Sequence, residues 1–169
     1  NCPPPPPAND LCGDAETIPC NSSVNGSTAG ATFDDVGFCG TSNTAAGVWY
    51  SFVATNITAN LSTCNQANFD TKISVFTCPC ENLVCVGGQD DGPGCSDLTT
   101  NLDVNTSPGE TYLVLVHGYG TSTGEFTLTL TCPCEEIVVP PQPPFEHMTG
   151  NILSVVGNPY LDGWTCSSC

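Results

Sequence analysis

The chain has 169 residues, of which 17 are acidic and only one, Lys72, is a strong base, so its formal net charge is −16 at pH 7. A protein with one lysine and no arginine cannot neutralise a row of phosphates, which excludes nucleic acid and anionic membrane surfaces as partners. Phosphoryl transfer is disfavoured for the same reason. No stretch of 18 apolar residues occurs, so we expect no membrane insertion.

Thirteen cysteines in a chain of this length predict a disulfide framework, and therefore a secreted or cell-surface protein. Zinc is the alternative, but the sequence holds only one Cys-x-x-Cys unit and structural zinc sites pair two such units. Because the number of cysteines is odd, at least one thiol is free or bonds to another chain. The outlying Cys2, Cys166 and Cys169 are our candidates for bonds between subunits, although pairing within the chain is an equal alternative.

The sequence also predicts covalent glycans. Five Asn-x-Ser/Thr sequons occur, where chance alone gives about three; their asparagines are Asn21, Asn25, Asn56, Asn60 and Asn105. The abundant Ser, Thr and Pro residues are candidate carriers of O-glycans. We therefore expect a glycoprotein.

Three segments follow one another along the chain. Residues 1–8 contain five consecutive prolines, which predict a polyproline II arm. Residues 9–134 show no sustained helical period and predict one antiparallel, jelly-roll-like β-sandwich. Trp49 and Tyr50 lie in the middle of an expected strand and are assigned to its core. The expected strands cover residues 47–54, 60–63, 72–77, 82–86, 98–104, 111–117 and 124–131.

The order of short motifs in residues 9–132 resembles a known family. These motifs are Asn9-Asp10-Leu11-Cys12, Gly30-Ala31-Thr32-Phe33-Asp34, Gly47-Val48-Trp49-Tyr50-Ser51-Phe52, Ser62-Thr63-Cys64, Phe69-Asp70-Thr71-Lys72-Ile73-Ser74-Val75-Phe76, Cys80-Glu81-Asn82-Leu83-Val84-Cys85, Asp90-Asp91, Gly109-Glu110-Thr111-Tyr112 and Gly124-Glu125-Phe126-Thr127-Leu128. Together they resemble the bacterial pre-peptidase C-terminal (PPC) type of β-sandwich and its cysteine-bearing secreted relatives. That resemblance implies a module that is non-catalytic in most family members. The chain departs from the family pattern in its extra cysteines, its proline arm and its tail.

The resemblance also implies two disulfides, Cys39–Cys64 and Cys80–Cys85. A third bond, Cys12–Cys20, is our own expectation from their closeness in sequence.

The tail, residues 135–169, holds two further apolar, strand-like stretches at 136–139 and 151–156. They can pack on their own domain as edge strands, or add to the sheet of another copy. Tyr160 and Trp164 in this tail are candidate anchors in a subunit interface, with sugar binding as the alternative.

Catalytic signatures are absent from the sequence. His117 and His147 belong to no nucleophile elbow, zincin motif or phosphate loop, so we expect no enzyme. Acidic residues in Gly- and Asn-rich loops suit calcium, with Asp10, Asp90 and Asp91 as first candidates, although no EF-hand spacing occurs and solvated turn acids are the alternative.

These observations predict a non-catalytic extracellular structural glycoprotein, a repeating subunit of a filament or surface layer. Copies would associate head-to-tail through arm and tail, since a contact that does not close gives a fibre. The alternative is an accessory module of a larger secreted protease or adhesin that binds carbohydrate or matrix protein.

Overall fold

The computed structural model of the chain describes residues 3–133. Several expectations lie outside these residues: Cys2, the two strand-like stretches of the tail, Tyr160, Trp164, Cys166 and Cys169. No helix in the described part is long and apolar enough to cross a membrane.

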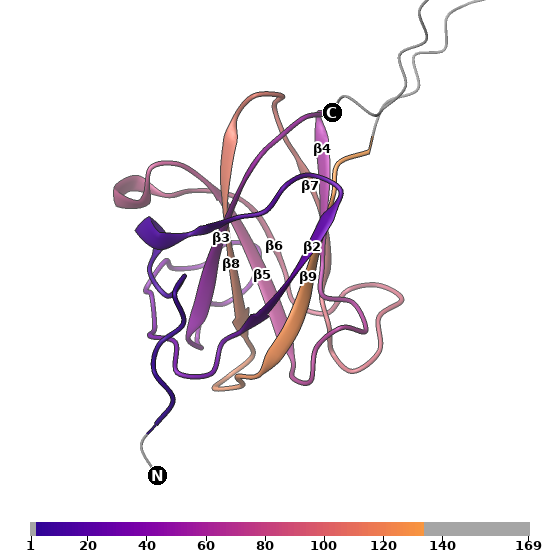
Figure 1. The fold of residues 1–169 in the computed structure, drawn as a ribbon. Coiled ribbons are helices and arrows are strands. Elements are labelled where there is room, and N and C mark those ends of the chain that lie inside the picture. The colour runs from indigo at the N-terminus through magenta and orange to yellow at the C-terminus, as the bar shows by residue number, and fades with distance from the viewer. Residues whose placement is uncertain (1–2, 134–169) are drawn as a thin grey trace, which may run out of the picture. The chain divides into compact units, whose positions relative to one another are not determined.

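The described chain folds into two packed β-sheets (Figure 1). The first sheet has the order β1-β3-β8-β5-β6 and the second has the order β2-β9-β4-β7. The strands are β1 (Glu16–Thr17), β2 (Ser22–Ser27), β3 (Gly47–Val53), β4 (Thr58–Ser62), β5 (Thr71–Thr77), β6 (Val84–Gln89), β7 (Asn101–Asn105), β8 (Thr111–Gly118) and β9 (Glu125–Thr131). All pairs are antiparallel except β1 with β3. From β2 onward the chain crosses between sheets at every connection except β5 to β6, which is the jelly-roll arrangement and confirms the predicted fold class.

The second sheet has one buried and one exposed face. Along β9, Phe126, Leu128 and Leu130 are buried, while the threonines between them face outward, as the sequence alternation predicts. The strands β4 and β7 alternate in the same way. Hydroxyl, amide and carboxylate side chains therefore cover the outer face of this sheet.

The central strands of the first sheet, β3, β8 and β5, are buried on both faces, whereas the edge strands β1 and β6 are exposed or partly buried. Burial on both faces explains why β3 and β8 are nearly continuous apolar runs. Tyr50 points into the core between the sheets, whereas Trp49 joins a second apolar cluster on the outer face with Phe76 and Leu115. The Trp49 ring donates its Nε1–H to Asp34 Oδ2 at 2.9 Å, which ties the preceding loop over this cluster. Both aromatic residues are about 1% exposed, so their assignment to the core is confirmed.

Sequence patterns missed β1 and β2. Strand β2 reads Ser-Ser-Val-Asn-Gly-Ser, so Val24 alone signals a buried face. Gly26 is required at its position because a Cβ there would collide with the hydroxyl of Tyr50 and the ring of Phe126. A glycine in an otherwise polar segment predicts a loop, but here it marks a close contact with the core.

Four disulfides join segments distant in sequence: Cys12–Cys80, Cys20–Cys132, Cys39–Cys85 and Cys64–Cys95. All six cysteines proposed from sequence form disulfides, but the pairings Cys39–Cys64, Cys80–Cys85 and Cys12–Cys20 are wrong. The first two pairings were implied by the family resemblance, and Cys12–Cys20 was expected from closeness in sequence. The jelly roll instead brings together strand ends that are 31 to 112 residues apart. Cys95 and Cys132 complete the framework.

The proline arm lies partly against the sandwich. Pro3 to Pro6 are exposed and belong to no regular element. The carbonyl groups of Pro4 and Pro5 lie beside Gly30, where φ is +82° and a Cβ would strike them. The N-terminal prolines are thus surface residues that contact a loop, not part of the core.

Candidate functional site

Three carboxylates gather at one site on the first sheet. Each of Asp70, Asp90 and Asp91 offers an oxygen atom, and these atoms lie within 4.8 Å of one another. Asp70 immediately precedes β5, and the other two follow β6, which pairs with β5. The hairpin therefore positions the three residues together, although about twenty residues separate them in sequence.

Lys72 is the cation of this cluster. Its side chain is about 1% exposed, and its Nζ lies 3.1 Å from Asp90 Oδ2 and 3.0 Å from the hydroxyl of Ser42. The ammonium group also lies 4.7 Å from the ring centroid of Tyr119, within range of a cation–π contact. The only lysine of the chain thus lies inside the protein, where Asp90 pairs its buried charge.

The cluster keeps an excess of negative charge. Burial raises the pKa of the Asp70 carboxyl, and repulsion from Asp90 and Asp91 raises it further, while Lys72 opposes the rise. Asp70 Oδ1 is buried without a hydrogen-bond partner in the described part of the chain. Sequence analysis did not place Asp70 among the first candidates for calcium and did not assign Lys72 to the site. The available signal was a lone lysine two residues after an aspartate, in a strand that is otherwise uncharged.

Asp10 is not part of this cluster, so the predicted set of Asp10, Asp90 and Asp91 is wrong in that member. Its carboxylate accepts hydrogen bonds from the backbone N–H of Thr32 at 2.6 Å and from the hydroxyl of Thr32 at 2.9 Å. Asp10 is buried and fastens the N-terminal segment to the loop after β2. The carboxylate of Asp10 therefore has a structural role, as the acceptor of two hydrogen bonds from Thr32.

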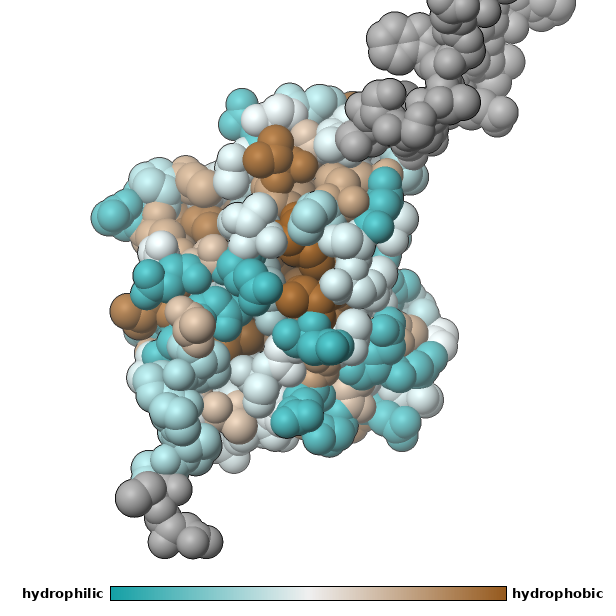
Figure 2. Space-filling view, in the orientation of Figure 1, coloured by the Kyte–Doolittle hydropathy of each residue, from teal (hydrophilic) through white to brown (hydrophobic). Residues whose placement is uncertain are grey.

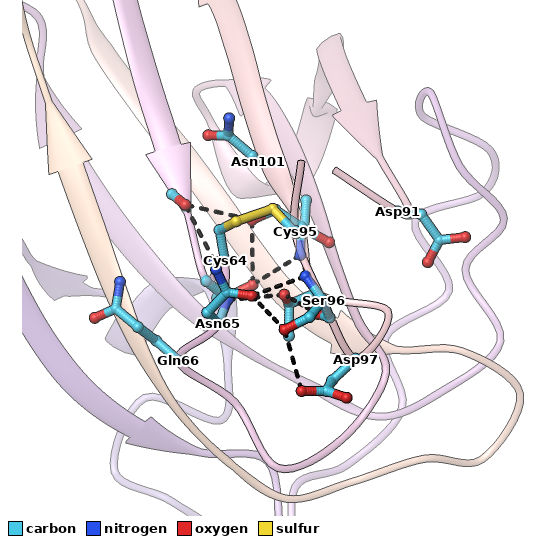
Figure 3. The surroundings of a disulfide bond; sticks show 12 residues. Cys64, Asn65, Gln66, Asp91, Cys95, Ser96, Asp97 and Asn101 are labelled. Atoms are coloured by element: carbon cyan, nitrogen blue, oxygen red, sulfur yellow. Dashed lines mark hydrogen bonds between the residues drawn. A yellow bond between two sulfur atoms is a disulfide. The ribbon is translucent and has the colours of Figure 1, made fainter. Parts of the chain in front are cut away.

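The loop that follows Asp90 and Asp91 is fixed by a disulfide and a small hydrogen-bond network (Figure 3). Cys95 bonds to Cys64, which follows β4. Asn65 Oδ1 accepts hydrogen bonds from the backbone N–H of Ser96 at 2.7 Å and from its hydroxyl at 2.6 Å. These contacts connect the acidic loop of the first sheet to the end of a strand in the second.

The Ser74–His117 pair lies close to Lys72. His117 Nε2 is 3.3 Å from the Ser74 hydroxyl oxygen, and that hydroxyl donates to the carbonyl of Cys39 at 3.3 Å. Both side chains are buried, at 1% and 0% exposure, and His117 Nδ1 has no partner among the described residues. A nucleophile needs substrate access and a base that receives its proton. This pair offers neither, because both side chains are enclosed in the first sheet, where His117 belongs to β8.

The five sequons lie on the surface of the second sheet or at the end where β9 finishes. Asn25, Asn60 and Asn105 belong to β2, β4 and β7 and face outward with the threonines of β9. Asn25 and Asn105 are exposed. Asn60 Nδ2 donates to Asn101 at 2.9 Å and to Asp103 at 2.8 Å.

The other two sequon asparagines hold the end of the sandwich. Asn21 Oδ1 accepts the backbone N–H of Cys132 at 2.9 Å. Asn56 Nδ2 donates to the carbonyl of Pro133, and its Oδ1 accepts the N–H of Ile57 at 2.7 Å. Both residues fasten the chain where β9 ends.

Among the described residues, Cys78 is the one cysteine outside a disulfide. It is exposed, and its thiol lies 3.7 Å from the carbonyl of Thr111. Sequence analysis placed the candidate linking thiols at the two ends of the chain and did not single out this one.

Comparisons with known proteins find similarity among solved structures but not among family models or curated proteins. No family model and no curated protein matches the chain. Among solved structures, the chain is similar to the pre-peptidase C-terminal domain of collagenase from Bacillus anthracis, at 17% sequence identity and a TM-score of 0.43. The alignment covers 69% of this chain and 94% of that domain. That domain is of the type that the sequence motifs resemble.

Burial of His117 predicts a pH dependence of stability. Desolvation, aided by the charge of Lys72, lowers the pKa of His117 to about 4, below its ordinary value of 6.5. The unfolded chain therefore binds a proton that the folded chain excludes, and stability falls as pH drops from about 6.5 toward 4. Between pH 7 and pH 5 we expect the wild type to lose about 2 kcal/mol more unfolding free energy than His117→Gln.

Urea unfolding of both proteins at the two pH values, with disulfides intact, measures this difference. Equal losses of unfolding free energy in the two proteins would show that His117 does not cause the pH dependence of stability.

Proposed function

We propose that the protein is a non-catalytic extracellular structural glycoprotein, a repeating subunit of a filament or surface layer that assembles head-to-tail through its arm and tail. One observation carries the proposal. The described strands already form a full jelly roll, yet the sequence continues with two more strand-like stretches at 136–139 and 151–156. A second copy can supply the sheet edge on which such a stretch would pair.

The disulfides support an extracellular location. Four bonds inside a sandwich of this size are typical of oxidising compartments and rare in reducing ones. They also suit a structural subunit, because cross-links between distant segments restrict the unfolded chain and thereby stabilise the folded one.

Glycans form part of the proposal. Asn25 and Asn105 are exposed on the outer face of the second sheet, so glycans there would extend into solvent. The amide nitrogens of Asn56 and Asn60 already donate hydrogen bonds, which makes these two less suited to carry glycans. With only 11% charged residues, the surface gains solubility from attached sugars.

The absence of catalysis is also proposed. Its support is the burial of Ser74 and His117, which puts the nucleophile–base pair that these two described residues could form out of reach of a substrate.

Calcium is proposed as a ligand of Asp70, Asp90 and Asp91. The support is the buried Asp70 oxygen, which has no hydrogen-bond partner within residues 3–133, and the repulsion of the Asp70 carboxylate by Asp90 and Asp91, which Lys72 does not fully offset. Oxygen ligands on loops are what calcium prefers.

Millimolar calcium is then expected to raise the Tm of the full chain, since a ligand that binds only the folded state stabilises it. Asp91→Asn should lose this rise, while Asp35→Asn, the same charge change at an exposed aspartate outside the cluster, should keep it. Equal behaviour of all three proteins in differential scanning calorimetry would refute the site.

A binding module is the second candidate, and one observation favours it. A shallow groove on the second sheet is lined by polar side chains that suit sugar hydroxyls, among them Asn25, Asn65, Gln66, Asn68 and Glu125. Such a module would be monomeric and would bind a polysaccharide or collagen column.

Electron microscopy of the native, untagged protein tests the two candidates. The subunit hypothesis predicts elongated polymers, and denaturing gels without reductant should show a ladder if Cys2, Cys166 or Cys169 link subunits. A strictly monomeric protein that is retained on a polysaccharide column would contradict it and support the module.

A further inference from the structure

The two sheets have four edge strands, and three of them are protected against pairing. Strand β1 is two residues long and begins with Glu16. Strand β6 contains a bulge and is covered at Gly88 by the loop of Cys39 and Gly40. Strand β7 carries Asp103. Short length, bulges, covering loops and charges are the devices by which proteins block edge pairing.

Strand β2 has none of these devices. It is six residues long, pairs without a bulge along its whole length with β9, and contains neither a charge nor a proline. It is therefore the one edge within residues 3–133 that is long, regular and uncharged.

The pairing of β9 shows which backbone groups of β2 are free. Thr127 donates its N–H to the carbonyl of Gln66, on the side of β9 away from β2. Its partner Asn25 must then direct its own N–H and C=O away from β9, because directly opposed residues of an antiparallel pair alternate between bonded and non-bonded. The same alternation directs the backbone N–H and C=O groups of Ser23 and Ser27 away from β9, in the plane of the sheet. No backbone hydrogen bond outside the sheets in the described part of the chain uses these six groups.

Apolar surface adjoins this edge. In Figure 2 hydrophobic residues reach the surface along the middle of the visible face, between β3 and β2 as Figure 1 places them. Val24 of β2 and Cys20 just before it are only partly buried and pack against the core between the sheets. An added strand would cover this apolar surface as well as the free backbone groups.

We propose that residues 151–156 of a second copy, Asn-Ile-Leu-Ser-Val-Val, add as a strand to the edge of β2. This inference rests on the proposed head-to-tail assembly and specifies which segments of two neighbouring copies would be in contact. Residues 149–158 carry no charge, and neither does β2. In a protein of net charge −16, two uncharged segments can meet without placing carboxylates against each other.

The length of the tail allows the contact. The tail comprises 36 residues after Pro133, and the strand-like stretch begins 18 residues into it. Such a spacer, extended at about 3.3 Å per residue, reaches farther than the width of one sandwich. A tail that binds the next copy gives a heterologous contact, which propagates as a fibre.

Glycans do not block this edge. The side chain of Asn25 lies on the outer face of the sheet, where its Oδ1 accepts a hydrogen bond from the hydroxyl of Thr127 at 2.8 Å. A sugar at Asn25 would project from that face, while the free N–H and C=O groups lie in the plane of the sheet.

Two variants of the full chain test the contact by light scattering after size exclusion. Asn25→Pro removes an outward N–H that makes no bond inside the domain, and proline is tolerated on edge strands. We expect it to abolish polymers and leave a folded single chain. Asn25→Gln removes the same sequon but keeps the N–H, so it should polymerise like the wild type. Replacing Ile152, Leu153, Val155 and Val156 by Ser should abolish polymers as Asn25→Pro does.

The outcomes separate the two proposals. A wild-type chain that never polymerises overturns both. Polymers that persist in Asn25→Pro, with circular dichroism confirming the fold, overturn the edge contact and leave the filament proposal standing. Polymers that persist in the four-serine tail variant show that another segment, such as β2 of a second copy, occupies the edge, and overturn the inference.

Discussion

The disulfides are the constraint on which the described structure depends. Cys12–Cys80 and Cys20–Cys132 tie the N-terminal segment to the ends of β5 in one sheet and β9 in the other. The second bond closes a separation of 112 residues, for which chain entropy alone gives about 4–5 kcal/mol. Electrostatic interactions add little to this stability, because the described residues contain a single ion pair, Lys72 with Asp90. The negative charges of this strongly acidic chain also repel one another.

The two sheets differ in how much of their outer faces is open to solvent. Loops held by Cys39–Cys85 and Cys12–Cys80 cover part of the outer face of the first sheet, so its central strands β3, β8 and β5 are buried on both sides. The outer face of the second sheet is open, polar and uncharged apart from Glu125 and Asp103, and it bears three of the five sequons. Solvation and glycans suit this face, while the free edge of β2 suits assembly. Within residues 3–133, Ser74 and His117 are enclosed in the first sheet and do not reach the surface.

Local patterns predicted the fold, and only tertiary structure could reveal the pairings. The alternation of Phe126, Leu128 and Leu130 with threonines is sufficient by itself to assign the inward face of β9. Strand β2 was missed because its burial rests on Val24 and on Gly26, whose role is to let Tyr50 and Phe126 approach. The disulfide pairs and the group of Asp70, Asp90 and Asp91 depend on which strand ends meet, and spacing along the chain carries no such information.

Mapping the disulfides of the native protein tests the central claim most directly. Peptic digestion at low pH without reductant prevents exchange, and mass spectrometry of the linked peptides then identifies each pair. The structure predicts Cys12–Cys80, Cys20–Cys132, Cys39–Cys85 and Cys64–Cys95. Bonds between sequence neighbours, such as Cys12–Cys20 or Cys80–Cys85, or reduced thiols at these eight positions, would contradict an oxidised jelly-roll scaffold.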